Sequence, residues 1–280
     1  MNLEPLKLSD LIRRYHLRPQ KYLGQNFLAD HNTLLKIVRD SGVDMDDEVL
    51  EIGAGIGSLT RVLATNAKKV VAVEIDRHLF PVLKAVTQPF PNIQLVQGDI
   101  LKIPITDLVE QGGYKVVANI PYYISSALIR YLLESEVRPD RIVFTMQREV
   151  AERITNADQK MSLLSLSVQI YGKATITSHI PAACFIPEPN VDSSVLVIDV
   201  FPEPVLQQSD IDLLFKLAHA AFNQKRKMLR SSLKEILGRG ADSVVDILEQ
   251  AGISSQERPE ALALEDWVRL TKVVREKAVL

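Results

Sequence analysis

The 280-residue chain has a single cysteine, Cys184, so it has no partner for an intrachain disulfide. No stretch approaches the 18 or so consecutive apolar residues that mark a membrane-spanning helix. The first ten residues carry neither an apolar signal core nor an Arg- and Ser-rich transit pattern. The five histidines are scattered, without the spacing of zinc ligands. We therefore expect a cytoplasmic protein with no metal site and no membrane segment.

The chain also lacks an excess of one charge: it has 33 Lys and Arg and 35 Asp and Glu, and its pI is near 6.2. This balance argues against coating nucleic acid by bulk charge, but it leaves room for a local basic surface. The two candidate clusters are Arg13, Arg14, Arg18 and Lys21 near the start, and Lys225, Arg226, Lys227 and Arg230 near the end. Each cluster is either a contact surface for nucleic acid or a solvated face.

From residue 34 onward, short apolar runs alternate with helical patterns. Strands are expected at 49–55, 70–76, 93–100, 114–122, 141–147, 162–172 and 193–200. Helices between the first five predict right-handed crossovers and a parallel sheet, whereas the last two strands suggest an antiparallel edge.

Prolines at 202 and 204 end this pattern, and short amphipathic helical segments follow. The fold class is therefore α/β. We expect a catalytic domain over residues 1–204 and a small helical domain over 205–280.

Groups suited to binding a ligand follow three successive strands. Gly53 and Gly55 form a tight turn after the first strand, Glu74 ends the second, and Asp99 follows the third. A carboxylate at Glu74 can accept both ribose hydroxyls of an adenosine, and Asp99 can accept from the adenine amino group. The spacing is GxGxG rather than GxGxxG, which favours a ligand without a pyrophosphate over a nicotinamide cofactor. A purely structural turn, with Asp99 as a helix cap, is the alternative.

The fourth strand ends in Asn119-Ile120-Pro121-Tyr122. The Asn119 side-chain oxygen and the Pro121 carbonyl can accept the two hydrogens of an exocyclic amine, and Tyr122 offers a ring on which an extruded base stacks. Such a site works by positioning and electrostatics, without a strong general base. Phe185 could close the other face of the base; its alternative is a buried loop anchor.

Several segments resemble, in order, the ribosomal RNA adenine dimethyltransferases. The matching segments are 24–28 (GQNFL), 51–55 (EIGAG), 74–76 (EID), 98–99 (GD), 119–122 (NIPY) and 185–193 (FIPEPNVDS). Two further segments, 221–227 (AFNQKRK) and 258–260 (RPE), look like the C-terminal domain of the small-subunit enzymes.

The resemblance implies a Rossmann-like class I methyltransferase sheet that uses S-adenosylmethionine. The substrate would be two adjacent adenosines in a hairpin loop near the 3′ end of small-subunit rRNA, within a pre-30S particle, and the enzyme would act as a monomer. The cofactor contacts it implies are Asn26, Leu28, Gly53, Gly55, Glu74, Asp99 and Asn119. The C-terminal basic cluster, Lys225, Arg226, Lys227 and Arg230, would contact RNA.

One departure and two rival functions remain. The loop at 155–165 lacks the Tyr-Gly that the family usually carries there, next to the expected entrance for the target base. A large-subunit rRNA methyltransferase that confers antibiotic resistance would share the catalytic motifs, but it lacks the FNQKRK pattern and is usually strongly basic. A non-catalytic assembly or transcription factor on the same fold would not need the intact motifs.

Overall fold

The computed structural model describes residues 3–110, 112–121, 124–155, 160–224, 227–238 and 240–278. A seven-stranded sheet forms the centre of the first of two compact units, which comprises residues 1–151 and 173–201. Its strands, in spatial order, are β4 (Ile93–Gln97), β3 (Lys69–Glu74), β2 (Glu48–Ile52), β5 (Lys115–Asn119), β6 (Arg141–Gln147), β9 (Ser193–Val200) and β7 (Gly172–Ile180). The pairs from β4 to β6 are parallel, and β9 joins β6 antiparallel, so the α/β prediction is confirmed.

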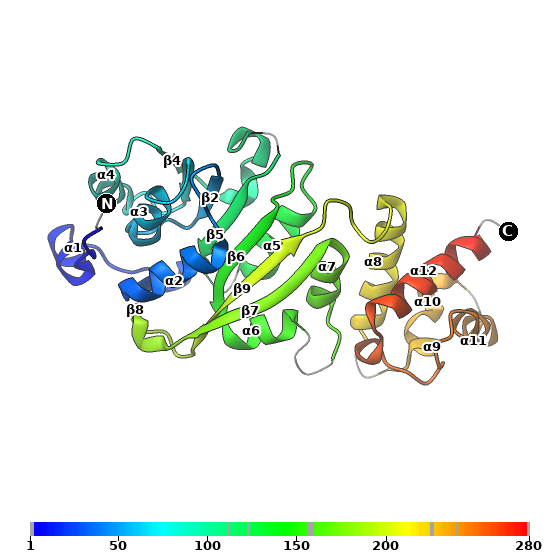
Figure 1. Cartoon of the computed structure of the whole chain (residues 1–280). Coiled ribbons are helices and arrows are strands. Elements are labelled where there is room, and N and C mark those ends of the chain that lie inside the picture. Colours follow the sequence, from blue (N-terminus) through cyan, green and yellow to red (C-terminus); the bar gives the residue numbers. More distant parts are fainter. Residues whose placement is uncertain are drawn as a thin grey trace. The chain divides into compact units, whose positions relative to one another are not determined.

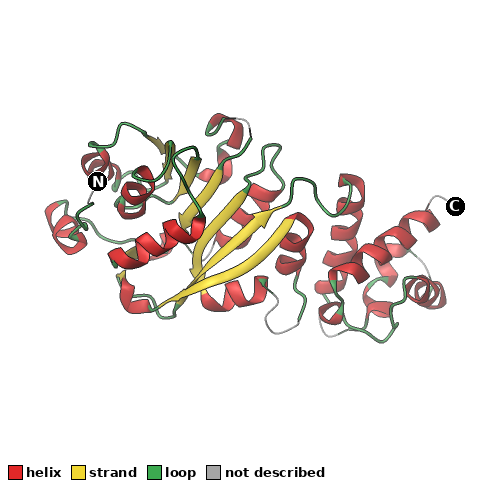
Figure 2. Cartoon of the chain, in the orientation of Figure 1, coloured by secondary structure: helices red, strands yellow, loops and turns green. Residues whose placement is uncertain are grey.

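Helices cover both faces of the sheet (Figures 1 and 2), with α2 and α3 on one face and α5 and α6 on the other. They are α2 (His31–Ser41), α3 (Ser58–Ala64), α4 (Phe80–Thr87), α5 (Ser125–Leu133) and α6 (Arg148–Ile154). Because helices lie on both faces, the central strands are buried on both sides: five of the six residues of β3 are buried, and four of these are Val or Ala. The α2 helix begins where the Asp30 carboxylate accepts the Thr33 backbone N–H at 2.7 Å and ends at left-handed Gly42.

The strand order reverses beside β2. The chain runs outward from β2 through β3 to β4, then returns to add β5 and β6 on the other side of β2. In such sheets, ligands bind beyond the carboxyl ends of the strands at this reversal. The fold therefore predicts a ligand site at the carboxyl ends of β2 and β5.

The predicted strand over 162–172 is wrong. This segment forms α7 (Leu163–Tyr171), which begins at a capping box in which Ser162 and Ser165 each bond the other's backbone N–H. Ser165 and Ser167 are buried in this helix, and the Ser167 hydroxyl donates to the Leu163 carbonyl at 2.8 Å. The edge strand β7 follows it, with an alternating exposed face that has too few large apolar residues to be recognised.

The N-terminal part of the chain contributes α1 (Leu8–Arg14), the 3₁₀ turn η1 (Lys21–Leu23) and the short strand β1 (Phe27–Leu28). Antiparallel pairing of β1 with β8 (Phe185–Ile186) places Leu28 opposite Phe185. This pairing holds the chain directly after residues 23–26, which line the pocket described below.

The second unit comprises residues 152–172 and 202–280. Besides α7 it contains α8 (Gln208–Phe222), α9 (Leu229–Ser232), α10 (Lys234–Leu237), α11 (Ala241–Gln250) and α12 (Leu264–Ala278). Fully buried Trp267 stacks on Phe222 at a ring-centroid distance of 5.8 Å, and Arg275 bonds both Asp210 oxygens. The α7 helix thus packs with α8 and α12, although the predicted boundary at 204 put it in the catalytic domain. None of the described helices combines the length and apolar character needed to cross a membrane.

Candidate active site

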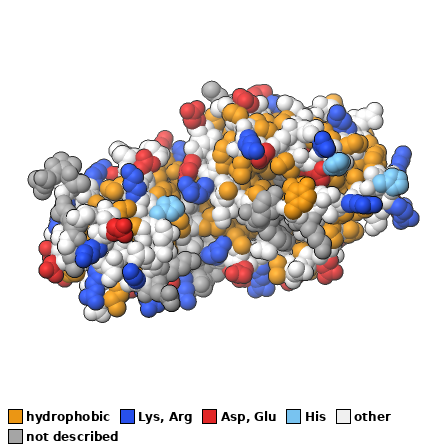
Figure 3. Space-filling model, turned by 180° about the vertical axis from the view of Figure 1, so that it is seen from behind, with side chains coloured by type: hydrophobic (Ala, Val, Ile, Leu, Met, Phe, Trp, Pro, Cys, Tyr) orange, Lys and Arg blue, Asp and Glu red, His pale blue; other side chains and the backbone are white. Residues whose placement is uncertain are grey.

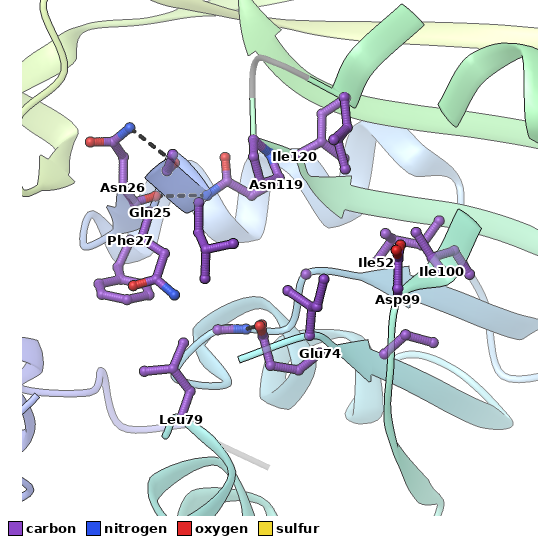
Figure 4. Close-up of a pocket in the computed structure, with 18 of the residues that line it drawn as sticks. Gln25, Asn26, Phe27, Ile52, Glu74, Leu79, Asp99, Ile100, Asn119 and Ile120 are labelled. Atoms are coloured by element: carbon purple, nitrogen blue, oxygen red, sulfur yellow. Dashed lines mark hydrogen bonds between the residues drawn. The ribbon is translucent and has the colours of Figure 1, made fainter. Parts of the chain in front are cut away.

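A pocket lies beyond the carboxyl ends of the central strands and holds about 830 Å³, its open mouth included. Seven predicted site residues line it: Asn26, Gly53, Gly55, Glu74, Asp99, Asn119 and Pro121. Figure 4 shows Asn119 and Glu74 on opposite sides of the open space, with Asp99 across from Gln25 and Asn26. Side chains far apart in sequence therefore converge on one cavity.

The glycine turn after β2 also lines this pocket. Gly55 has a left-handed φ of 59°, and a Cβ built there would lie 3.2 Å from the Phe27 ring. Gly53, with a φ of 77°, would place a Cβ 3.8 Å from the Asn119 carbonyl oxygen. Side chains at these positions would strain the backbone and narrow the pocket.

Glu74 joins this turn to the end of β3. Its two carboxylate oxygens accept the backbone N–H groups of Gly55, at 2.7 Å, and Asp76, at 2.8 Å. The side chain is almost fully buried, and burial raises the pKa of Glu74, while these hydrogen bonds act in the opposite direction. Each oxygen retains a lone pair that can accept from a hydroxyl in the pocket.

Asp99 combines the two alternatives considered for it. One of its oxygens caps the 3₁₀ turn η2 (Ile100–Lys102) by accepting the Leu101 N–H at 3.2 Å. The residue also lines the pocket, with its side chain about one-third exposed. Capping therefore orients the carboxylate without removing it from the cavity.

Asn119, the last residue of β5, faces the N-terminal segment. Its side-chain nitrogen donates to the Asn26 carbonyl at 3.0 Å, and because a carbonyl only accepts, this contact fixes which end of the amide is nitrogen. The Asn119 side-chain oxygen is left as the acceptor. The Pro121 carbonyl accepts the Ile124 N–H at 3.2 Å and keeps a second lone pair. Tyr122 lies outside the described residues.

Two predicted residues lie away from the pocket lining. Leu28 and Phe185 are each 3% exposed and belong to one hydrophobic cluster, where their strands pair. The burial of Phe185 favours the loop anchor over a stacking partner. Of the C-terminal basic cluster, Lys227 and Arg230 are exposed, whereas Lys225 and Arg226 lie outside the described residues.

Three residues of or near the site have no predicted role. Ile75 lines the pocket although 48% exposed, and Gln25 lines it while bonding Asp76. Glu51, two residues before Gly53, is 1% exposed, and burial raises its pKa to about 8. All three lie inside the motifs at 24–28, 51–55 and 74–76, and this position was the sequence feature that could have indicated a role in the site.

Comparison with known proteins gives consistent matches over nearly the whole chain. A family model described as ribosomal RNA adenine dimethylase matches residues 17–276. The ribosomal RNA small subunit methyltransferase A of Lachnoclostridium phytofermentans is 38% identical over 283 residues, which cover 98% of each protein. The protein of that name from Alkaliphilus metalliredigens is also 38% identical, with 97% of each covered.

Two solved structures have a similar fold. A dimethyladenosine transferase from Plasmodium falciparum has a TM-score of 0.79 and 26% identity, covering 90% of this chain and 98% of that one. The 23S rRNA methyltransferase ErmE has a TM-score of 0.73 and 26% identity, covering 89% and 100%.

Proposed function

Because the chain belongs to the ribosomal RNA adenine dimethylase family, we propose that it methylates N6 of two adjacent adenosines in a hairpin loop near the 3′ end of small-subunit rRNA. The fold is the Rossmann-like sheet of rRNA methyltransferases. One observation carries the proposal: Asn119 and Pro121 line the same pocket as the glycine turn and Glu74. A target amine at the end of β5 would thus meet a methyl donor bound at the ends of β2 and β3.

The pocket residues fit S-adenosylmethionine as that donor. Glu74 presents carboxylate oxygens for the ribose hydroxyls, and Asp99 presents one for the adenine amine. Gly53 and Gly55 leave the space that a Cβ would occupy, beside the Asn119 carbonyl and the Phe27 ring. When bound, this cofactor supplies an electrophilic methyl group on a sulfonium centre.

The target side of the site needs two acceptors and an aromatic surface. The Asn119 oxygen and the Pro121 carbonyl would hold both hydrogens of the amine, so that its lone pair is directed at the methyl donor. Tyr122 would stack on the extruded base. Stacking by Phe185 would require that it leave its buried position, so we favour Tyr122 over Phe185 as the ring that stacks on the base. Rate enhancement would come from orientation and preorganised dipoles.

The RNA-contacting surface is proposed on the C-terminal helical unit, at Lys225, Arg226, Lys227 and Arg230. Figure 3 draws one face of the molecule, on which Lys and Arg side chains are interspersed with acidic ones. Such a surface favours recognition of RNA shape within a partly assembled particle over binding by bulk charge. We place this activity in the cytoplasm, in a monomeric enzyme.

Relatives at 38% identity named for the small subunit favour this substrate over the large subunit, whose enzyme ErmE is 26% identical. A non-catalytic factor would have no need of Glu74, Asp99 and Asn119 around one pocket. The loop at 155–165, whose residues 156–159 lie outside the described residues, would tune RNA binding.

The decisive experiment incubates the protein with labelled methyl donor and small subunits from a strain that lacks this modification. We expect up to four methyl groups per particle, mapped to two adjacent adenosines. Large subunits and an Asn119→Ala variant are the controls. Label on large-subunit RNA, or no label on either particle, would overturn the proposal.

A further inference from the structure

The Gln25 side chain links the N-terminal segment to the sheet. Its amide nitrogen donates to an Asp76 oxygen at 2.8 Å, and its amide oxygen accepts the Gln20 N–H at 2.8 Å. Asp76 is 7% exposed, and its second oxygen accepts the His78 N–H at 2.9 Å. Both ends of the amide and both carboxylate oxygens therefore have defined partners.

The next residue carries the other contact of this segment. The Asn26 carbonyl accepts the Asn119 side-chain N–H, so residues 25 and 26 are bonded to the end of β3 on one side and to the end of β5 on the other. Residues 23–27 all line the pocket. In Figure 4, Gln25 and Asn26 stand on one side of the cavity, next to Asn119.

The remaining hydrogen bonds described for residues 20–26 join this segment mainly to itself. Leu23 N–H and Gln25 N–H both donate to the Gln20 carbonyl, at 3.1 and 3.4 Å, and the Asn26 side chain donates to the Gly24 carbonyl at 3.3 Å. Downstream, β1 and an Ala29 N–H to Cys184 carbonyl bond of 2.8 Å hold the chain. Residues before Gln25 also pack through Leu17 against the cluster of Phe27 and Leu79. Among the hydrogen bonds described for residues 20–26, the Gln25–Asp76 bond is the one that reaches the end of β3.

We propose that Gln25 is a positioning residue that aligns the Asn119 amide through the Asn26 carbonyl, with Asp76 as its anchor. The inference rests on the proposed function for its effect on turnover. Without the Gln25–Asp76 bond, the Asn26 carbonyl is free to shift, and the Asn119 amide loses the partner that sets its orientation. The target amine would then meet a misaligned acceptor.

Reversal of the hydrogen bond gives a stringent test. Gln25→Glu places a second carboxylate against Asp76, so the bond is lost and the two charges repel. Adding Asp76→Asn restores a bond of opposite direction: the new amide donates to the new carboxylate. In that double variant the His78 and Gln20 N–H groups keep their oxygen acceptors. Gln25→Met removes the bond without adding charge.

The matched control is Gln208→Glu. Gln208 donates to Asp212 at 3.0 Å on the exposed surface of α8, so the same carboxylate clash is created far along the chain from the pocket motifs. We expect Gln25→Glu and Gln25→Met to lower kcat about tenfold or more, as for a lost charge-assisted hydrogen bond. KM for the RNA particle should change less than about twofold, and Gln208→Glu should match wild type.

Two readouts are independent of turnover. Amide hydrogen exchange of residues 23–27 in the free protein should accelerate in both single Gln25 variants. It should slow again in the swapped pair, the double variant Gln25→Glu with Asp76→Asn. Calorimetric affinity for S-adenosylhomocysteine should follow the same order. If the wild-type protein transfers no methyl group, the proposed function fails. Hydrogen exchange and calorimetry still test whether the Gln25–Asp76 bond orders residues 23–27.

The positioning role is overturned if Gln25→Glu keeps the wild-type kcat, or if the swapped pair regains slow exchange but not turnover. Unchanged exchange in Gln25→Met would overturn it equally, and this holds even where the swapped pair does not fold.

Discussion

The side-chain nitrogen of Asn119 donates to the backbone carbonyl of Asn26 across 93 residues of chain, at 3.0 Å. One end of the amide is thereby committed to the protein, and the other, an acceptor, is available to a substrate amine. The contact uses the backbone of Asn26, so the identity of the Asn26 side chain is immaterial to it.

We expect Asn119→Asp to lower kcat about 10²-fold or more, the range for loss of a preorganised transition-state contact. An oxygen would replace the nitrogen that faces the Asn26 carbonyl, so the side chain would turn away. Single-turnover methylation of small subunits measures this, and RNA-particle binding should stay near wild type. Asn26→Ala keeps the carbonyl and should retain kcat while weakening cofactor binding. Equal loss of kcat in both variants would contradict the assignment.

Gly55→Ala should weaken cofactor binding and destabilise the protein, because a Cβ there lies 3.2 Å from the Phe27 ring at a φ of 59°. Gly238 has the same φ of 59°, and a Cβ added to it would have no heavy atom within 4 Å. Gly238→Ala therefore isolates the backbone strain, about 1–2 kcal/mol. Calorimetry with S-adenosylhomocysteine and urea unfolding separate the two effects. Similar cofactor affinity in both variants would show that Gly55 is needed only for its backbone conformation.

Glu74→Ala should reduce cofactor affinity by at most a few kcal/mol, as for lost hydrogen bonds to a charged group. It also leaves the Gly55 and Asp76 N–H groups without their acceptor, so stability should fall. Glu48, at the opposite end of β2, forms an ion pair with Lys69 at 2.7 Å. Glu48→Ala is thus a control that should alter stability alone, and unchanged affinity in Glu74→Ala would refute the ribose assignment.

The site was predictable where its residues terminate strands. Gly53, Glu74 and Asn119 follow apolar runs, and parallel strands bring their carboxyl ends to one edge of a sheet. Knowledge of the strand order was not needed to place them together. Only the approximate ends of the apolar runs were required.

What could not be predicted depends on contacts between distant segments. The burial of Leu28 and Phe185 follows from a two-residue strand pair, too short to leave a periodic pattern. The hydrogen bond from Gln25 to Asp76 joins residues 51 positions apart, and no local sequence pattern connects them. The α7 segment was misassigned because its serines satisfy their hydroxyls within the helix and so tolerate burial.

Charge reversal at Lys227 and Arg230 should weaken binding to small subunits and reduce its salt dependence. Each phosphate contact contributes a slope of about −0.7 to −0.9 in log K against log salt, through counterion release. Filter binding at several salt concentrations measures the slope. Lys272→Glu, an exposed change on α12, should leave it unchanged. Equal slopes in all variants would identify the cluster as a solvated face.

Glu51 gives the protein a pH-dependent stability. Its carboxyl, on β2, is almost fully buried, and burial, with a smaller contribution from the nearby Glu74 charge, raises its pKa from 4.5 to about 8. A raised folded-state pKa means that the folded protein retains a proton that the unfolded chain has released. The stabilisation by that proton is complete below pH 4.5 and is lost as the pH rises to about 8.

Glu51→Gln keeps a neutral side chain of the same shape at every pH, so its stability should lose this dependence. Relative to wild type, it should gain stability progressively from pH 4.5 to 8, reaching an order of a few kcal/mol, and the difference should stay constant at higher pH. Urea unfolding at steps between pH 5 and 9 measures the difference. Glu136→Gln, an exposed change after α5, is the control for removal of a glutamate elsewhere on the chain. A difference between Glu51→Gln and wild type that does not vary with pH would mean that Glu51 is ionised in the folded protein throughout this range.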